Sequence, residues 1–161
     1  MSTTNFETSI NAPKEKVWEI LADFSGIYKW APLVTNSTSI TADNIGLGCE
    51  RTCEIQNMGS IIERVTEWNE GEGYKIEVAT IPGTPVKSGF TSWLLKSEGN
   101  QTIAKILSHF ELEGTEEEKN AFLENVPQLL KSSLMGLKRY AETGQCVETD
   151  DLYHMTGRTH N

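Results

Sequence analysis

Two charged side chains lie within alternating apolar segments, and they are the residues of this sequence best suited to chemistry. Arg51 alternates with Cys53 and Ile55, and Glu63 follows Ile61 by two positions. A carboxyl group in an apolar pocket can act as a general acid–base, and a nearby guanidinium can stabilise an enolate or a carboxylate. The same two residues could instead form a partly buried ion pair that fixes strand register, or could orient a polar group of an apolar ligand.

The charges on these two segments predict how they pair. A three-residue turn, 57–59, with its glycine in the left-handed conformation, places Cys53 opposite Glu63 and makes Arg51 a diagonal neighbour of Glu63. A two-residue turn would place Glu54 opposite Glu63, and like charges across strands are unfavourable. We therefore predict the three-residue turn, with Arg51 and Glu63 on the more apolar face, which should look toward a helix.

The later alternating segments add residues to this inward face. Apolar and hydroxyl side chains alternate with charged ones in 74–81 and 102–112, which places His109 outside. The segment 89–96 is ambiguous; we favour its even-numbered residues, including Leu94, as inward, which leaves Trp93 outside. With two positions of the C-terminal helix, the predicted ligand-binding residues are Arg51, Cys53, Ile55, Ile61, Glu63, Tyr74, Ile76, Phe90, Ser92, Ser108, Phe110, Leu130 and Leu134.

The elements that must position these side chains follow from periodicity and turn residues. Apolar–polar alternation with intervening glycine, proline and asparagine indicates an antiparallel meander. The first strand is predicted at 6–10, and Pro13 suits the first turn of a helix that carries Val17 and Leu21. A second short helix is expected at 27–30. The meander strands are predicted at 34–41, 49–56, 60–68, 74–81, 89–96 and 102–112.

A long helix closes the predicted domain. Thr115 with Glu118 three residues later resembles a capping box, and Gly144 is suited to ending the helix. Pro127 lies inside the helical stripe, which predicts a kink or break near residues 125–126 because proline removes a backbone hydrogen bond. Residues 145–161 are polar and aperiodic, which predicts a flexible tail.

Composition excludes several classes of function. The chain has 161 residues, 37% hydrophobic and 23% charged, which is typical of one soluble domain. The net charge of −9 argues against nucleic acid and anionic membranes as partners. No apolar run is long enough to span a membrane, and the first residues lack the features of a secretory signal. Three cysteines without such a signal favour reduced thiols and a cytoplasmic location.

Several short motifs occur in an order that resembles a known superfamily. They are Ala12-Pro13 with Val17-Trp18, Asp23-Phe24, Trp30-Ala31-Pro32, Gly46-x-Gly48-x-x-Arg51, and Gly59 followed by Glu63-Arg64-Val65. The chain is similar to the START-like (SRPBCC) superfamily of helix-grip proteins, and within it to the polyketide cyclase/dehydratase-like branch. This resemblance implies an α+β domain over residues 1–144. In it, a curved antiparallel sheet of about seven strands wraps a long C-terminal helix, and two short helices follow strand 1.

The resemblance implies three functions, of which the residues favour the first. The first is binding of a small hydrophobic or amphipathic molecule in an internal cavity, as a carrier or sensor. The second is a cyclase or dehydratase acting on a polyketide-like substrate, with Glu63 as acid–base and Arg51 as anchor. The third is an interaction module with a closed cavity. Ligand binding requires a cavity of about 300 Å³ or more.

No cofactor or metal is expected, because no His/His/carboxylate set is found in the sequence. The oligomeric state, monomer or dimer, stays open.

Overall fold

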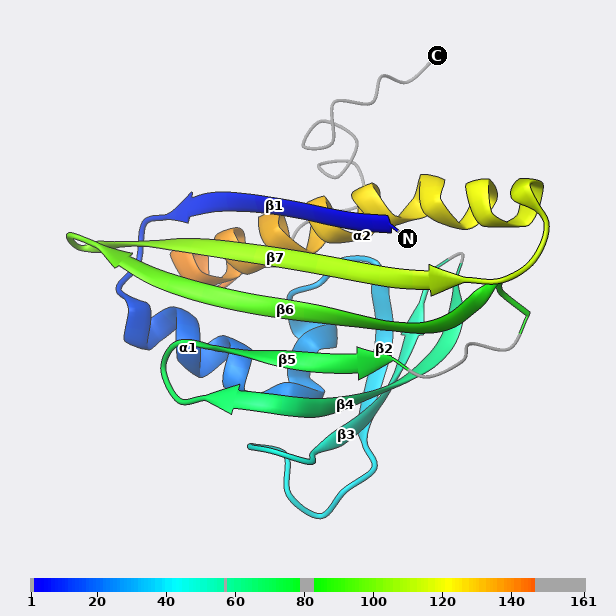
Figure 1. The fold of residues 1–161 in the computed structure, drawn as a ribbon. Coiled ribbons are helices and arrows are strands. Elements are labelled where there is room, and N and C mark those ends of the chain that lie inside the picture. Colours follow the sequence, from blue (N-terminus) through cyan, green and yellow to red (C-terminus); the bar gives the residue numbers. More distant parts are fainter. Residues whose placement is uncertain (1, 57, 79–82, 147–161) are drawn as a thin grey trace.

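The computed structural model describes residues 2–56, 58–78 and 83–146, in which seven strands form one antiparallel sheet (Figure 1). The strand order is β1-β7-β6-β5-β4-β3-β2, so the chain meanders from β2 to β7 and β1 pairs with the last strand. The elements are β1 (Ser2–Ile10), α1 (Lys14–Ala22), the 3₁₀ helix η1 (Phe24–Lys29), β2 (Val34–Ser39), β3 (Glu50–Ile55), β4 (Gly59–Asn69), β5 (Gly73–Val78), β6 (Val86–Glu98), β7 (Gln101–Leu112) and α2 (Glu116–Thr143).

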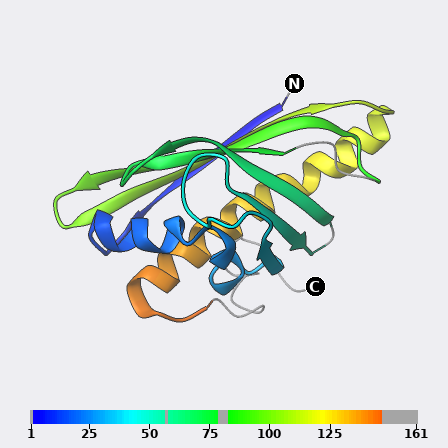
Figure 2. The same cartoon turned by 90° about the horizontal axis from the view of Figure 1, so that it is seen from below.

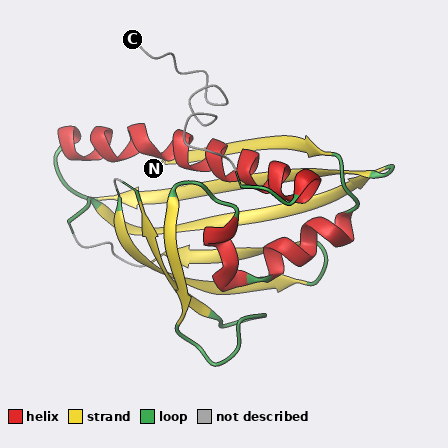
Figure 3. Cartoon of the chain, turned by 180° about the vertical axis from the view of Figure 1, so that it is seen from behind, coloured by secondary structure: helices red, strands yellow, loops and turns green. Residues whose placement is uncertain are grey.

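The three helices lie on one face of the curved sheet (Figure 3). The long helix α2 runs across the concave side, with α1 and η1 beside it (Figure 2). Side chains on the strands alternate between buried and exposed, so one face of the sheet forms the core together with the helices. The predicted fold class, a helix-grip α+β domain, is therefore confirmed.

The ends of α2 are fixed by the residues that the sequence indicated. Thr115 Oγ1 accepts a hydrogen bond from the Glu118 backbone N–H at 3.1 Å and donates one to its carboxylate at 3.1 Å. Gly144 ends the helix in the left-handed conformation, with φ 74°. These contacts satisfy backbone groups at the two ends that have no partner inside the helix.

Of the kink or break predicted near residues 125–126, the break is wrong, because α2 is continuous from Glu116 to Thr143. Val126 and Leu130, on either side of the proline, are buried against the sheet. Packing of this apolar face holds the helix together through the missing hydrogen bond. Residues 147–161 of the tail predicted at 145–161, and the predicted end of the strand at 79–81, lie outside the described residues.

Gly136 sets how closely α2 approaches the segment after η1. A Cβ atom at this position would lie 2.0 Å from the carbonyl oxygen of Trp30 and 2.9 Å from Cδ of Pro32. Only glycine allows the two backbones to come this near. The contact fixes the C-terminal half of α2 against the helices at one end of the sheet.

Candidate functional site

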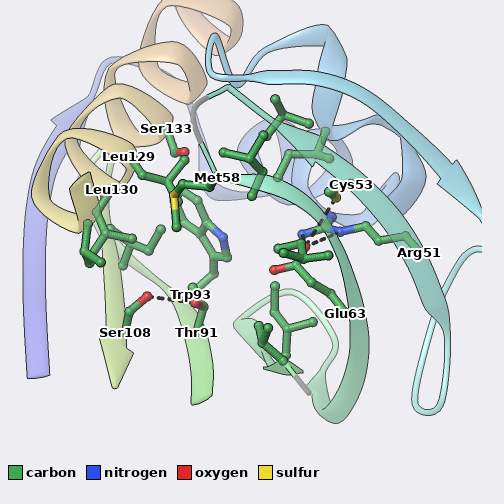
Figure 4. Close-up of a pocket in the computed structure, with 18 of the residues that line it drawn as sticks. Arg51, Cys53, Met58, Glu63, Thr91, Trp93, Ser108, Leu129, Leu130 and Ser133 are labelled. Carbon is green, nitrogen blue, oxygen red and sulfur yellow. Dashed lines mark hydrogen bonds and ion pairs between the residues drawn. The ribbon is translucent and has the colours of Figure 1, made fainter. Parts of the chain in front are cut away.

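A cavity of about 60 Å³ lies between α2 and the concave face of the sheet (Figure 4). Most of its wall is aliphatic or aromatic, and its polar side chains come from β3, β4, β6, β7 and α2. The lining residues are Ile27, Val34, Arg51, Cys53, Ile55, Met58, Ile61, Glu63, Ile76, Val78, Thr91, Trp93, Ile106, Ser108, Phe110, Val126, Leu129, Leu130 and Ser133.

Most of the predicted ligand-binding residues line this cavity. Tyr74 and Leu134 are buried but are not part of its wall. Tyr74 instead donates a hydrogen bond to the Leu21 carbonyl at 3.2 Å, beneath α1. The predicted residues that do line the cavity are Arg51, Cys53, Ile55, Ile61, Glu63, Ile76, Ser108, Phe110 and Leu130.

The predicted orientation of β6 is wrong. Thr91 and Trp93 face the cavity, whereas Phe90 and Ser92 lie on the other face and Leu94 is 50% exposed. Both faces of this strand carry apolar and polar side chains, so alternation alone could not choose between them. Burial of the large indole of Trp93, which is 1% exposed, decides the orientation in the folded protein.

The ring of Phe90, which this orientation leaves outside the cavity, contacts polar side chains. The ring of Phe90 stacks on His109, with 5.6 Å between the ring centres, and the ammonium of Lys75 lies 4.3 Å from the centre of the Phe90 ring. His109 lies outside the cavity, as the alternation of β7 predicts. These contacts cover part of the Phe90 ring on the convex face.

The pairing of β3 with β4 is shifted by two residues from the predicted one. Arg51 lies directly opposite Glu63, and Glu50 lies directly opposite Arg64. The two faces are as predicted, and Gly59 has the predicted left-handed conformation, with φ 83°. The predicted turn at 57–59 is wrong, because Gly59 already pairs with Ile55 as the first residue of β4. The observed register places opposite charges face to face on both sides of the hairpin, where the predicted register made them diagonal neighbours.

Arg51 is held on three sides. Its Nε and Nη2 atoms each lie 2.9 Å from Oε1 of Glu63, and Nη1 donates to the Phe24 carbonyl at 2.6 Å. The guanidinium carbon lies 3.9 Å above the centre of the Phe24 ring. Burial alone would lower the pKa of Arg51, but the charge and hydrogen bond of Glu63, together with the influence of Cys53 and Tyr74, raise it, so the guanidinium stays charged.

Glu63 presents the free polar atom of this ion pair. Oε1 accepts from Arg51 and lies 3.4 Å from the Cys53 sulfur, whereas Oε2 has no hydrogen-bond partner among the described residues. Glu63 lies between Arg51 and the rest of the cavity (Figure 4). Burial first, and then the charge of Glu63, raises the pKa of Cys53, so its thiol stays protonated and is no nucleophile.

Other polar groups lie on the opposite wall. The hydroxyls of Thr91 and Ser108 hydrogen-bond to each other at 2.7 Å. Ser133 on α2 and Trp93 also line the cavity, and Figure 4 shows the indole nitrogen of Trp93 turned toward the side of Glu63. The cavity therefore offers donors on one wall and a carboxylate oxygen on the other.

Met58 separates the cavity from a wider cleft at the surface. The cleft has a volume of about 380 Å³ and lies between the β3–β4 turn, the segment before β6 and the first turns of α2. Met58 contributes to the walls of both spaces. The other residues of the cleft are Gly83, Thr84, Pro85, Glu118, Ala121, Phe122 and Asn125.

The sequence matches the model of a known protein family. A family model described as "Polyketide cyclase / dehydrase and lipid transport" matches residues 1–142. The chain belongs to this family. The START-like fold that the sequence resemblance implied is thereby confirmed, and no curated protein matches the sequence.

Solved structures share the family's helix-grip fold. A structure of an uncharacterised protein from Bacillus thuringiensis is 21% identical over 87% of this chain and 98% of its own, with a TM-score of 0.70. A solution structure from Thermobifida fusca is 19% identical over 92% of this chain and 99% of its own, with a TM-score of 0.70. Ara h 8.0201 is 12% identical over 84% and 97%, with a TM-score of 0.62. These identities show the fold alone.

Sequence reasoning missed part of the cavity wall. Val78 and Ile106 lay on faces predicted to be inward, and Val126, Leu129 and Ser133 lay in the predicted helical stripe, so their patterns carried a signal. The remaining missed residues, Ile27, Val34, Met58, Thr91 and Trp93, depend on how η1, β2, the β3–β4 turn and β6 pack. No alternation within a single segment indicates those contacts.

The described residues contain no group of three His, Cys, Asp or Glu side chains that could hold a metal ion. None of the described helices is long and apolar enough to cross a membrane.

Proposed function

We propose that this protein reversibly binds a compact, mostly apolar molecule in the cavity between α2 and the sheet. The observation that carries the proposal is the composition of the wall, in which aliphatic and aromatic side chains surround a few polar groups. The family description, which includes lipid transport, supports it. Residues 1–144 form the proposed binding unit. The three free thiols of the chain, two of them in this unit, support the proposed cytoplasmic location.

The volume limits what the described conformation can hold. At about 60 Å³, the cavity is smaller than the roughly 300 Å³ that we expected and that drug-sized ligands occupy. Binding therefore requires the wall to move. Met58 and Leu129 are only partly buried, and the flexible thioether of Met58 lies between the cavity and the surface cleft. Displacement of Met58 would join the two spaces.

Methyl NMR with a small apolar probe tests binding. During titration with p-xylene, we expect saturable shifts of the δ1 methyl groups of Ile76 and Ile106, which line the cavity. The methyl group of Ile62, which is 52% exposed and lies outside the cavity, should not shift. If the signals of the cavity methyl groups do not shift at the highest probe concentration, the result would support the closed interaction module instead. Native mass spectrometry of the protein from its own cells would then identify the bound molecule.

A matched pair of variants locates the binding site. Val126 and Val86 are each 2% exposed, but only Val126 lines the cavity. Val126→Ile places a methyl group in empty space, so we expect weaker p-xylene binding with stability unchanged or raised by up to about 1 kcal/mol. Val86→Ile should cost about 1–3 kcal/mol through overpacking and leave affinity unchanged. Equal affinities in the two variants would place the probe elsewhere.

The free oxygen of Glu63 favours a second candidate, acid–base catalysis on a polyketide-like substrate. Oε2 faces the cavity and could accept a proton from a bound molecule. Arg51 would then act by holding the carboxylate in place. Glu63→Gln should abolish turnover of such a substrate while binding persists, and equal turnover in the variant would remove Glu63 from the mechanism.

A further inference from the structure

The charges in the cavity wall cancel. Among the described lining residues, Arg51 is the only cation and Glu63 the only anion, and they contact each other at 2.9 Å. Arg51 also gives an N–H to the Phe24 carbonyl and stacks on the Phe24 ring. The side chain of Arg51 is 1% exposed and that of Glu63 is 10% exposed. The ion pair therefore turns its anionic oxygen toward the cavity and its cation away from it.

This arrangement opposes the binding of charged ligands. A ligand carboxylate would have no uncompensated cation to pair with and would meet the oxygen of Glu63. The donors on the other wall, Trp93, Ser133 and the Thr91–Ser108 pair, are uncharged, and uncharged donors alone do not repay the removal of an ion from water. An ammonium group would likewise leave the site with a net charge. A neutral hydroxyl can donate to Oε2 of Glu63 at little desolvation cost.

We propose that the cavity selects neutral molecules that carry a hydroxyl group, a phenol or an alcohol, with that hydroxyl donating to Glu63, and that it rejects carboxylates. This inference rests on the proposed binding function. It assigns Glu63 as the specificity-determining residue and Arg51 as the residue that positions it. The guanidinium neutralises the site and does not anchor a ligand anion.

Three probes of nearly equal shape test the selection at pH 7. p-Xylene, p-cresol and p-toluate differ at one position, which carries a methyl, a hydroxyl or a carboxylate group. We expect p-cresol to bind about five- to tenfold more tightly than p-xylene through the hydrogen bond to Glu63. We expect p-toluate to bind at least about a hundredfold more weakly than p-cresol, because its charge is uncompensated. Affinities come from the shifts of the Ile76 and Ile106 methyl groups.

A variant that weakens the preference for p-cresol sharpens the test. Glu63→Gln keeps an oxygen acceptor but leaves Arg51 uncompensated, so p-toluate should gain at least about tenfold relative to p-cresol, which narrows the preference. Glu142→Gln is the matched control. It changes the total charge by the same amount at an exposed pair with Lys138, and should leave the ranking unchanged. If Glu63→Gln does not fold, the ranking of the three probes on the wild-type protein decides.

The possible results separate this inference from the binding function. Tighter binding of p-cresol than of p-toluate, with the difference reduced at least about tenfold by Glu63→Gln, supports the selection. Binding of p-toluate as tight as that of p-cresol in the wild-type protein overturns it and leaves the binding function standing. Failure of all three probes to shift the cavity methyl groups overturns both proposals.

Discussion

Removing one member of the buried ion pair should destabilise the protein far more than removing both. In Glu63→Leu, the guanidinium of Arg51 stays charged at 1% exposure and keeps only its contacts with Phe24. Loss of one partner of a buried pair costs about 3–5 kcal/mol. We expect about 4 kcal/mol for Glu63→Leu. Arg51→Met should cost somewhat less, about 3 kcal/mol, because the carboxylate left behind is 10% exposed, whereas Arg51 is 1% exposed.

The double variant Arg51→Met/Glu63→Leu restores an apolar interior without an unpaired charge. Its expected loss is about 2 kcal/mol, mainly from the Phe24 carbonyl that has lost its donor. The singles sum to about 7 kcal/mol, so the coupling energy is about 5 kcal/mol. Urea denaturation followed by circular dichroism measures all four proteins, with equal denaturant slopes as the check on two-state behaviour.

An exposed pair provides the control for this cycle. Lys119 and Glu116 lie 3.5 Å apart, and Glu116 is 85% exposed. Alanine substitutions at these two positions should show a coupling below about 0.5 kcal/mol. If the losses at Arg51 and Glu63 add to within about 0.5 kcal/mol, the two side chains do not interact energetically and the reasoning from their geometry is refuted.

Three further predictions follow from buried groups. Burial raises the pKa of Tyr74 to about 12, above the unfolded value of about 10. As the pH rises, the unfolded chain therefore loses the phenolic proton before the folded protein does, which favours unfolding. Stability should therefore fall by about 2 kcal/mol between pH 10 and pH 12, and Tyr74→Phe should show a shallower fall in alkaline denaturation. A thiol reagent should label Cys146 in the folded protein and should reach the buried Cys49 and Cys53 only after unfolding; Cys146→Ser should abolish the fast phase. Gly136→Ala should lower the melting temperature, because its Cβ would lie 2.0 Å from the Trp30 carbonyl; a rise, as alanine gives in open helices, would contradict the close approach.

Sequence patterns predicted most of the fold and part of the candidate site, and the reason is physical. Burial alternates with period two along a strand, so the residues that share a face can be identified within one segment. Arg51 and Glu63 were assigned to the inward face in this way. The register itself depends on the partner strand. The diagonal and direct pairings both join opposite charges, so charge alone did not decide between them, and the observed one lies two residues away.

The small cavity follows from a contact that no single segment reveals. Trp93 faces inward and packs edge-on against Trp30, with 5.6 Å between the ring centres, so its indole occupies space expected to be open. Both tryptophans are at least nine-tenths buried, and Trp30 lies against Gly136 of α2. Moving Trp93 would disturb this whole contact. Expansion for a ligand must therefore come from the opposite wall, where Met58 and Leu129 are only partly buried. The route of access then runs through the cleft beside Met58, with the donors of Trp93 and Ser133 on one wall and Glu63 on the other.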